Sequence, residues 1–137
     1  DFEPGSAEVH ALHGAALTFL DRPAEALAAF DRALAITPDD PNLLYQSANM
    51  LQNLGRQADA ILRLNRAIAL DPYNPAPIFS RATSLALTGD NAGSRADFLR
   101  VLELDTSGTQ YGSMAEGFLD ILDGLDAAAA EQQEADE

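Results

Sequence analysis

Two segments decide the fold of this 137-residue chain: Arg32-Ala33-Leu34-Ala35-Ile36-Thr37-Pro38 and Arg66-Ala67-Ile68-Ala69-Leu70-Asp71-Pro72. They are nearly the same in sequence and lie 34 residues apart, the spacing that also separates Pro4 from Pro38 and Gly55 from Gly89. A third copy ends with Val101-Leu102-Glu103-Leu104-Asp105-Thr106, in which threonine replaces the proline. A period of this length indicates a repeat protein, in which each unit packs on its neighbours.

Each repeat divides into two helical patterns of about 14 residues, joined by short turns rich in Gly, Asp, Asn and Pro. Asp40-Pro41 and Asn74-Pro75 each place a capping side chain before a proline at the first helical position. Gly55 and Gly89 follow apolar runs, as expected for a left-handed residue just after a helix end. The pattern predicts helices over residues 7–20, 23–36, 41–54, 57–70, 75–88 and 91–104.

The C-terminal part of the chain departs from the repeat. An apolar stripe at helical spacing predicts one further helix that covers the last repeat, and packing on the helix at 91–104 is favoured over a partner-binding surface. The stripe consists of Tyr111, Met114, Phe118, Ile121, Leu122 and Leu125. Residues 126–137 contain only small, acidic and amide side chains, so we expect them to fray or be disordered.

The sequence resembles the tetratricopeptide repeat (TPR) family. The small residues Gly14, Ala48 and Ala82 and the larger residues Phe30, Leu64 and Phe98 occupy the sites where that family brings its two helices together. One site that usually holds leucine in the family departs from the pattern, with His13, Ser47 and Arg81.

The resemblance implies an all-α fold, a right-handed α-solenoid of three helix-turn-helix TPR repeats plus a C-terminal capping helix. The repeats are expected at residues 7–40, 41–74 and 75–108, with the capping helix at 109–126 and an acidic tail at 127–137. Residues 1–6 are either a linker or the end of an upstream repeat. Because the chain begins with Asp1, we expect it to be processed or part of a longer protein.

Composition excludes several classes of function. The chain has 22 acidic residues, eight arginines and a net charge of -14, so it would be repelled by nucleic acid and by anionic membranes. It has no cysteine, which excludes disulfides and thiolate metal sites, and no apolar run long enough to insert into a membrane. We expect a soluble protein, either cytoplasmic or bacterial periplasmic.

No catalytic motif is present: the sequence holds no activated nucleophile, paired catalytic carboxylates or phosphate-binding glycine loop. His10 and His13 share a helix face, but two histidines without a clear third ligand are weak evidence for a metal. We therefore expect no enzymatic activity, no metal and no cofactor.

The resemblance implies a binding groove on the concave side, which the first helix of each repeat lines. The groove candidates are Ala11, Ala15, Phe19, Tyr45, Asn49, Gln52, Asn53, Phe79, Thr83 and Leu87. Amide side chains suit the backbone of an extended peptide, and aromatic side chains suit its apolar residues. An ordinary polar surface with scattered aromatics remains the alternative.

One subclass of ligand is disfavoured. Family members that clamp the C-terminal carboxylate of chaperones carry lysine, asparagine and arginine at two sites of successive first helices. Those sites here hold no cation, and a carboxylate would lack a charge-assisted partner. The residues are Ala11, Ala15, Tyr45, Asn49, Phe79 and Thr83.

These observations predict a non-enzymatic protein-protein interaction module that presents a concave groove to a peptide or protein segment of unknown identity. Two alternatives remain open. The chain is a structural or oligomerisation segment of a longer array, with self-association through the first helix, or it is a regulatory region of a larger protein.

Overall fold

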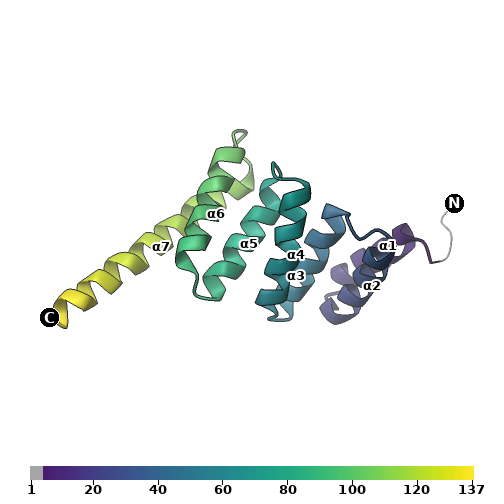
Figure 1. The fold of residues 1–137 in the computed structure, drawn as a ribbon, viewed down its shortest axis with the longest axis horizontal. Coiled ribbons are helices and arrows are strands. Elements are labelled where there is room, and N and C mark those ends of the chain that lie inside the picture. The colour runs from purple at the N-terminus through teal and green to yellow at the C-terminus, as the bar shows by residue number, and fades with distance from the viewer. Residues whose placement is uncertain (1–4) are drawn as a thin grey trace.

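The computed structural model describes residues 5–137, and this part of the chain forms seven helices and no strand. The helices follow one another as a stack, with α1 near the N-terminal end and α7 at the other end (Figure 1). Their bounds are α1 Ala7–Phe19, α2 Pro23–Ile36, α3 Pro41–Asn53, α4 Gln57–Leu70, α5 Pro75–Leu87, α6 Asn91–Leu104 and α7 Gln110–Ala135. The six helices predicted within the repeats begin and end within one residue of these bounds. The architecture is the predicted all-α solenoid. Phe2 and Pro4, on which the idea of an upstream repeat depends, lie outside the described residues.

Capping side chains fix the helix starts. Asp40 Oδ1 accepts the backbone N–H groups of Asn42 (3.0 Å) and Leu43 (3.2 Å), and Asn74 Oδ1 accepts the N–H of Ala76 (3.2 Å). These bonds satisfy donors that have no partner inside the helix.

Equivalent residues end the first helix of each pair. Asp21, Gly55 and Gly89 have φ angles of 57°, 77° and 90°, in the left-handed region. Glycine adopts this conformation at little cost, whereas Asp21 is one of the polar residues that tolerate it. The turn sends the chain back along the helix that it has just left, so the two helices of a pair pack side by side.

Small residues let the paired helices approach each other. A Cβ added at Gly14 would lie 2.6 Å from the ring of Phe30, so this site admits no side chain unless the ring moves.

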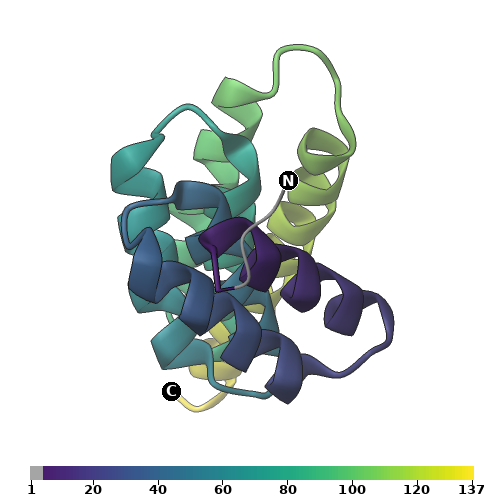
Figure 2. The same cartoon turned by 90° about the vertical axis from the view of Figure 1, so that its right-hand side faces the viewer.

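The buried residues form two apolar clusters, one within α1–α4 and the other within α5–α7. Phe30 belongs to the first cluster and Phe98 to the second. Figure 2 views the same stack from the N-terminal end.

The last helix corrects two expectations. The helix α7 continues to Ala135, so the expectation that residues beyond Leu125 fray or are disordered is wrong. Alanine, glutamate and glutamine have high helix propensities, and this run of them extends the helix although every side chain from residue 127 onward is exposed. The predicted stripe also packs only in part: Leu122 is buried, whereas Met114, Ile121 and Leu125 are exposed.

A search of the described residues for a membrane-crossing helix finds none of sufficient length and apolarity.

Candidate functional site

A hollow of about 270 Å³ lies between α1 and α3. It exists because Ala15, one of the predicted groove residues, is too small to fill the space in front of α3. Asn49, a second predicted residue, lies across from it. The lining residues are Ala15, Thr18, Phe30, Gln46, Asn49 and Met50. Phe30 and Met50 are the large apolar residues of this lining, and Thr18, Gln46 and Asn49 are its polar residues.

Asn49 has a defined orientation in this hollow. Ser80 Oγ donates to Asn49 Oδ1 (3.0 Å), which leaves Nδ2 as a donor. Among residues 5–137, Nδ2 has no hydrogen-bond partner. The structure thus presents an oriented N–H donor at the edge of the hollow.

Gln52, by contrast, is used to hold α3 against α5. Its Nε2 donates to the Ser80 carbonyl oxygen (2.8 Å) and to Ser84 Oγ (2.7 Å), and Ser84 Oγ donates to Gln57 Oε1 (2.7 Å). Gln52 is one of the predicted groove amides, and in the structure its Nε2 is engaged by α5.

An aromatic cluster lies near the C-terminal end of the surface that the first helices of the repeats, α1, α3 and α5, line. The ring of Phe79, a predicted groove residue, lies 5.7 Å from Tyr111 and 5.8 Å from Phe118, measured between centroids. Burial and, next, the neighbouring hydroxyl of Tyr45 on α3 raise the pKa of Tyr111. Tyr45 and Phe79 are therefore brought together with two residues of α7.

The remaining predicted residues are not brought into one site. Phe19 and Leu87, at the helix ends, are 90% and 72% exposed, and Asn53 is also exposed. Ala11 packs against the N-terminal core, and Thr83 Oγ1 donates to the Ser80 carbonyl oxygen (2.8 Å). Of the ten predicted residues, Ala15 and Asn49 line the hollow and Tyr45 and Phe79 join the aromatic cluster.

Sequence reasoning missed Gln46 and Met50, which lie one helical turn apart on α3 and form one wall of the hollow. They sit beside the sites that the family resemblance marks, and the small side chain of Ala15 on the facing helix was the available signal. Tyr111 and Phe118 belong to the apolar stripe of the predicted capping helix. The prediction did not include their contact with Phe79, a residue of the predicted groove.

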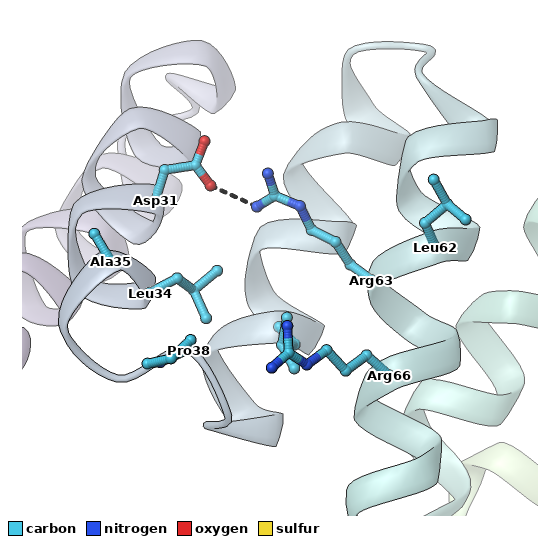
Figure 3. A pocket seen from close by; sticks show the side chains of 8 residues that line it. Asp31, Leu34, Ala35, Pro38, Leu62, Arg63 and Arg66 are labelled. Atoms are coloured by element: carbon cyan, nitrogen blue, oxygen red, sulfur yellow. Dashed lines mark hydrogen bonds and ion pairs between the residues drawn. The ribbon is translucent and has the colours of Figure 1, made fainter.

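A second hollow, of about 450 Å³, lies on the opposite side of the stack between α2 and α4 (Figure 3). Leu34, Pro38 and Leu44 provide its apolar part. Arg63 pairs with Asp31 across the cleft, and Arg66 pairs with Asp39. Because each cation already has an acidic partner, the rim of this hollow carries no net charge.

Cations and metal ligands do not gather on the predicted groove surface. Arg81, the one arginine on a first helix, donates through Nε and Nη2 to the two carboxylate oxygens of Asp97 (2.7 and 2.8 Å). Within the described range, no three His, Cys, Asp or Glu side chains are placed to hold a metal ion. His13 is exposed and His10 partly buried on α1.

Comparison with known proteins identifies the repeat. Residues 7–40 and residues 29–62 each match a family model described as a tetratricopeptide repeat. Residues 7–62 thus match the tetratricopeptide repeat family. No match was found among the curated proteins.

Solved TPR structures share the fold of this chain. The first TPR of Spaghetti (RPAP3), bound to the HSP90 peptide SRMEEVD, is 21% identical with a TM-score of 0.81, covering 88% of this chain and 93% of that chain. The Yersinia enterocolitica type III secretion chaperone SycD, in complex with a peptide of the translocator YopD, is 15% identical with a TM-score of 0.81, covering 87% and 93%. The Sgt2 TPR domain from Aspergillus fumigatus is 17% identical with a TM-score of 0.80, covering 91% and 82%.

Proposed function

We propose that this TPR protein is a non-enzymatic interaction module that binds an extended peptide segment of a protein partner in the hollow between α1 and α3. The observation that carries the proposal is Asn49. Its Oδ1 is held by Ser80, and its free Nδ2 can donate to a peptide carbonyl oxygen. A donor fixed by a neighbouring bond loses little side-chain entropy when a ligand binds.

The rest of the hollow suits an apolar side chain of the same peptide. Phe30 and Met50 provide apolar walls, and Ala15 leaves the space open. Methionine is unbranched and adaptable, so Met50 can adjust to side chains of different shape. We therefore expect one apolar residue of the ligand in the hollow, with the adjacent backbone carbonyl on Asn49.

Two of the structurally similar proteins support the class of ligand. The Spaghetti (RPAP3) domain and SycD were both solved with bound peptides. The chemistry of the ligand must differ from an acidic chain terminus, because the predicted groove residues here include no cation. We expect the peptide SRMEEVD to bind no more tightly than about 1 mM, since its carboxylates would find no charge-assisted partner.

The test is a selection of random nine-residue peptides displayed on phage, followed by calorimetric titration of a synthetic peptide that was enriched. Asn49→Ala removes the donor, and Ala15→Leu fills the hollow. We expect each substitution to weaken binding about tenfold or more.

Asn53→Ala is the matched control, because Asn53 is an exposed asparagine on the same helix outside the hollow. It should bind the selected peptide as the unmodified chain does. The proposed site is contradicted if no peptide is enriched. It is also contradicted if Asn49→Ala and Ala15→Leu bind the selected peptide as tightly as the unmodified chain does.

A further inference from the structure

The helix α7 carries a second apolar row that the solenoid covers only in part. Its face toward α5 and α6 is formed by Gly112, Ala115, Leu119 and Leu122, of which Leu119 is only partly buried. A neighbouring row, here called the α7 stripe, has exposed fractions of 41%, 38%, 60% and 53% at Met114, Phe118, Ile121 and Leu125. In this row Phe118 also contacts the body of the molecule, through Phe79 and Phe98.

The spacing of the α7 stripe fits another helix. Its members follow one another at intervals of four, three and four residues. This is the alternating spacing of the two apolar positions in a coiled-coil heptad, whose side chains insert between those of a facing helix. An extended strand presents side chains to one face every second residue and cannot match these intervals.

Two glycines border the stripe. Gly117 and Gly124 lie seven residues apart on α7, and a Cβ added at either would meet nothing within 4 Å. Glycine inside a helix is unfavourable relative to alanine, and packing within this chain does not require it at either site. A side that lacks Cβ atoms lets the backbone of a facing helix approach closely.

The charges of α7 point away from the stripe. At 3.6 residues per turn, Glu116 and Asp123 fall on the opposite side of the helix. Asp123 and Asp126 pair with Arg95 of α6, which places them on the flank that packs against the solenoid. A basic helix seated on the stripe would therefore gain nothing from these acids, and an uncharged apolar seam fits best.

We propose that the α7 stripe pairs with the α7 stripe of a second copy of this chain. The second copy supplies the same uncharged heptad seam, and its acidic residues also face outward, so like charges are kept apart. The stripe exposes roughly 400 Å² of largely apolar surface per copy, about half of what a standard stable interface buries on each side. The dimer should therefore be weak, with a dissociation constant above about 1 µM.

The experiment measures the mass of the full 137-residue chain by sedimentation velocity from about 10 µM to about 1 mM. The unmodified chain should shift from monomer to dimer over this range. Ile121→Glu places a charge in the seam and should abolish the shift. Leu12→Glu is the matched control, because Leu12 is 55% exposed on α1 at the other end of the molecule. It should dimerise normally.

A monomer at every concentration overturns the proposal. So does a dimer that survives Ile121→Glu and is lost in Leu12→Glu, since that result assigns self-association to the first helix. Peptide binding between α1 and α3 is measured separately, so failure of the dimer leaves the proposed function standing, and the reverse also holds.

A second variant separates pairing from folding. Gly117→Ala should raise the melting temperature of the monomer, because alanine favours the helix and the added methyl group meets open space. It should weaken the dimer at least threefold, because the methyl group holds the facing helix away. An unchanged dissociation constant would place Gly117 outside the seam and overturn this pairing geometry.

Discussion

Two equivalent clefts, between α2 and α4 and between α4 and α6, differ in what fills them. In the first, which holds the 450 Å³ hollow, Ser47 is buried and its hydroxyl donates to the Leu44 carbonyl oxygen of its own helix, without crossing the cleft. In the second, the residue 34 positions later is Arg81, which crosses the cleft to Asp97 and to Asn65 Oδ1 (3.0 Å). Serine at this site therefore leaves the first cleft open, whereas arginine at the equivalent site spans the second.

The other side of the stack repeats this contrast. Adding 34 to the numbers of the residues that line the α1–α3 hollow gives Asn49, Gln52, Leu64, Ser80, Thr83 and Ser84. At those sites Gln52 bonds to Ser80 and Ser84, and these bonds bridge the space between α3 and α5. The helices α1–α4 thus line two hollows, whereas α5–α7, here called the platform, pack through the rings of Phe79, Phe98 and Phe118. Equivalent backbones differ in binding capacity because their side chains differ in size and hydrogen bonding.

The largest expected effect concerns the packing of the platform. Phe98 is fully buried, and its ring stacks on Phe118 with a centroid distance of 5.0 Å and lies 5.5 Å from Phe79. Phe98→Ala should lower the free energy of unfolding by about 4 kcal/mol, measured by denaturant titration. Leu64→Ala, at the equivalent site of the preceding repeat, should cost about 3 kcal/mol. A larger cost at Leu64 would reverse the expected order of the two regions.

The second largest difference in stability is expected between the two ion pairs of the clefts, Arg81–Asp97 and Arg63–Asp31. The side chain of Asp97 is 10% exposed and binds Arg81 through both oxygens, whereas Asp31 is 46% exposed beside Arg63. The hydrogen bond from Arg81 to Asp97 also raises the pKa of Arg81. Asp97→Ala should cost about 2 to 3 kcal/mol because it leaves Arg81 partly buried without its partner. Asp31→Ala should cost less than about 1 kcal/mol. Equal losses in urea titrations would show that the filled cleft is no more tightly held than the open one.

The helices were predictable from sequence because each has a local cause. The caps Asp40 and Asn74 fix two helix starts, and Gly55 and Gly89 fix two ends, so the bounds follow from residues within one turn. The extent of α7 was missed because its last residues bury nothing, and an argument from burial ignores their intrinsic helix propensity.

The candidate site was predicted only in part, for a different reason. The family resemblance indicates which positions face the groove, but the partner of each side chain depends on a helix about 30 residues away. Gln52 and Asn49 look alike in sequence, yet Ser84 satisfies the Nε2 of Gln52 and no described residue satisfies the Nδ2 of Asn49. The role of Arg81 likewise depends on Asp97, which lies on the next helix.

Gly14 tests how closely the paired helices of the N-terminal region pack. The ring of Phe30 occupies the space that a Cβ at Gly14 would need, so Gly14→Ala must displace the ring. Overpacking lowers the free energy of unfolding by about 1 to 3 kcal/mol, and the higher helix propensity of alanine offsets up to about 1 kcal/mol of this loss. We expect a net loss of about 1 kcal/mol in denaturant titration. A stabilised variant would show that Phe30 moves freely into the adjacent α1–α3 hollow.

The smallest expected effect is the pH dependence of the link between α6 and α7. The Asp105 carboxylate accepts the backbone N–H groups of Thr109 (2.9 Å) and Gly112 (2.7 Å). These bonds, that of Thr109 first, lower the pKa of Asp105 below its ordinary value of 3.8. A carboxyl group whose pKa is lower in the folded state stabilises that state above its unfolded pKa, and the contribution is lost as the pH falls through the folded value.

Hydrogen exchange of the Gly112 amide should therefore lose protection below about pH 4 in the unmodified chain. Asp105→Asn should reduce this protection at neutral pH and remove the acid-dependent step, because its side chain does not ionise. Asp71→Asn is the matched control: Asp71 stands 34 residues earlier, and its side chain makes no hydrogen bond to another described residue. If Asp105→Asn retained the same acid-dependent step as the unmodified chain, the step would belong to another carboxylate, and the start of α7 would be held by packing of Ala115 and Leu122 alone.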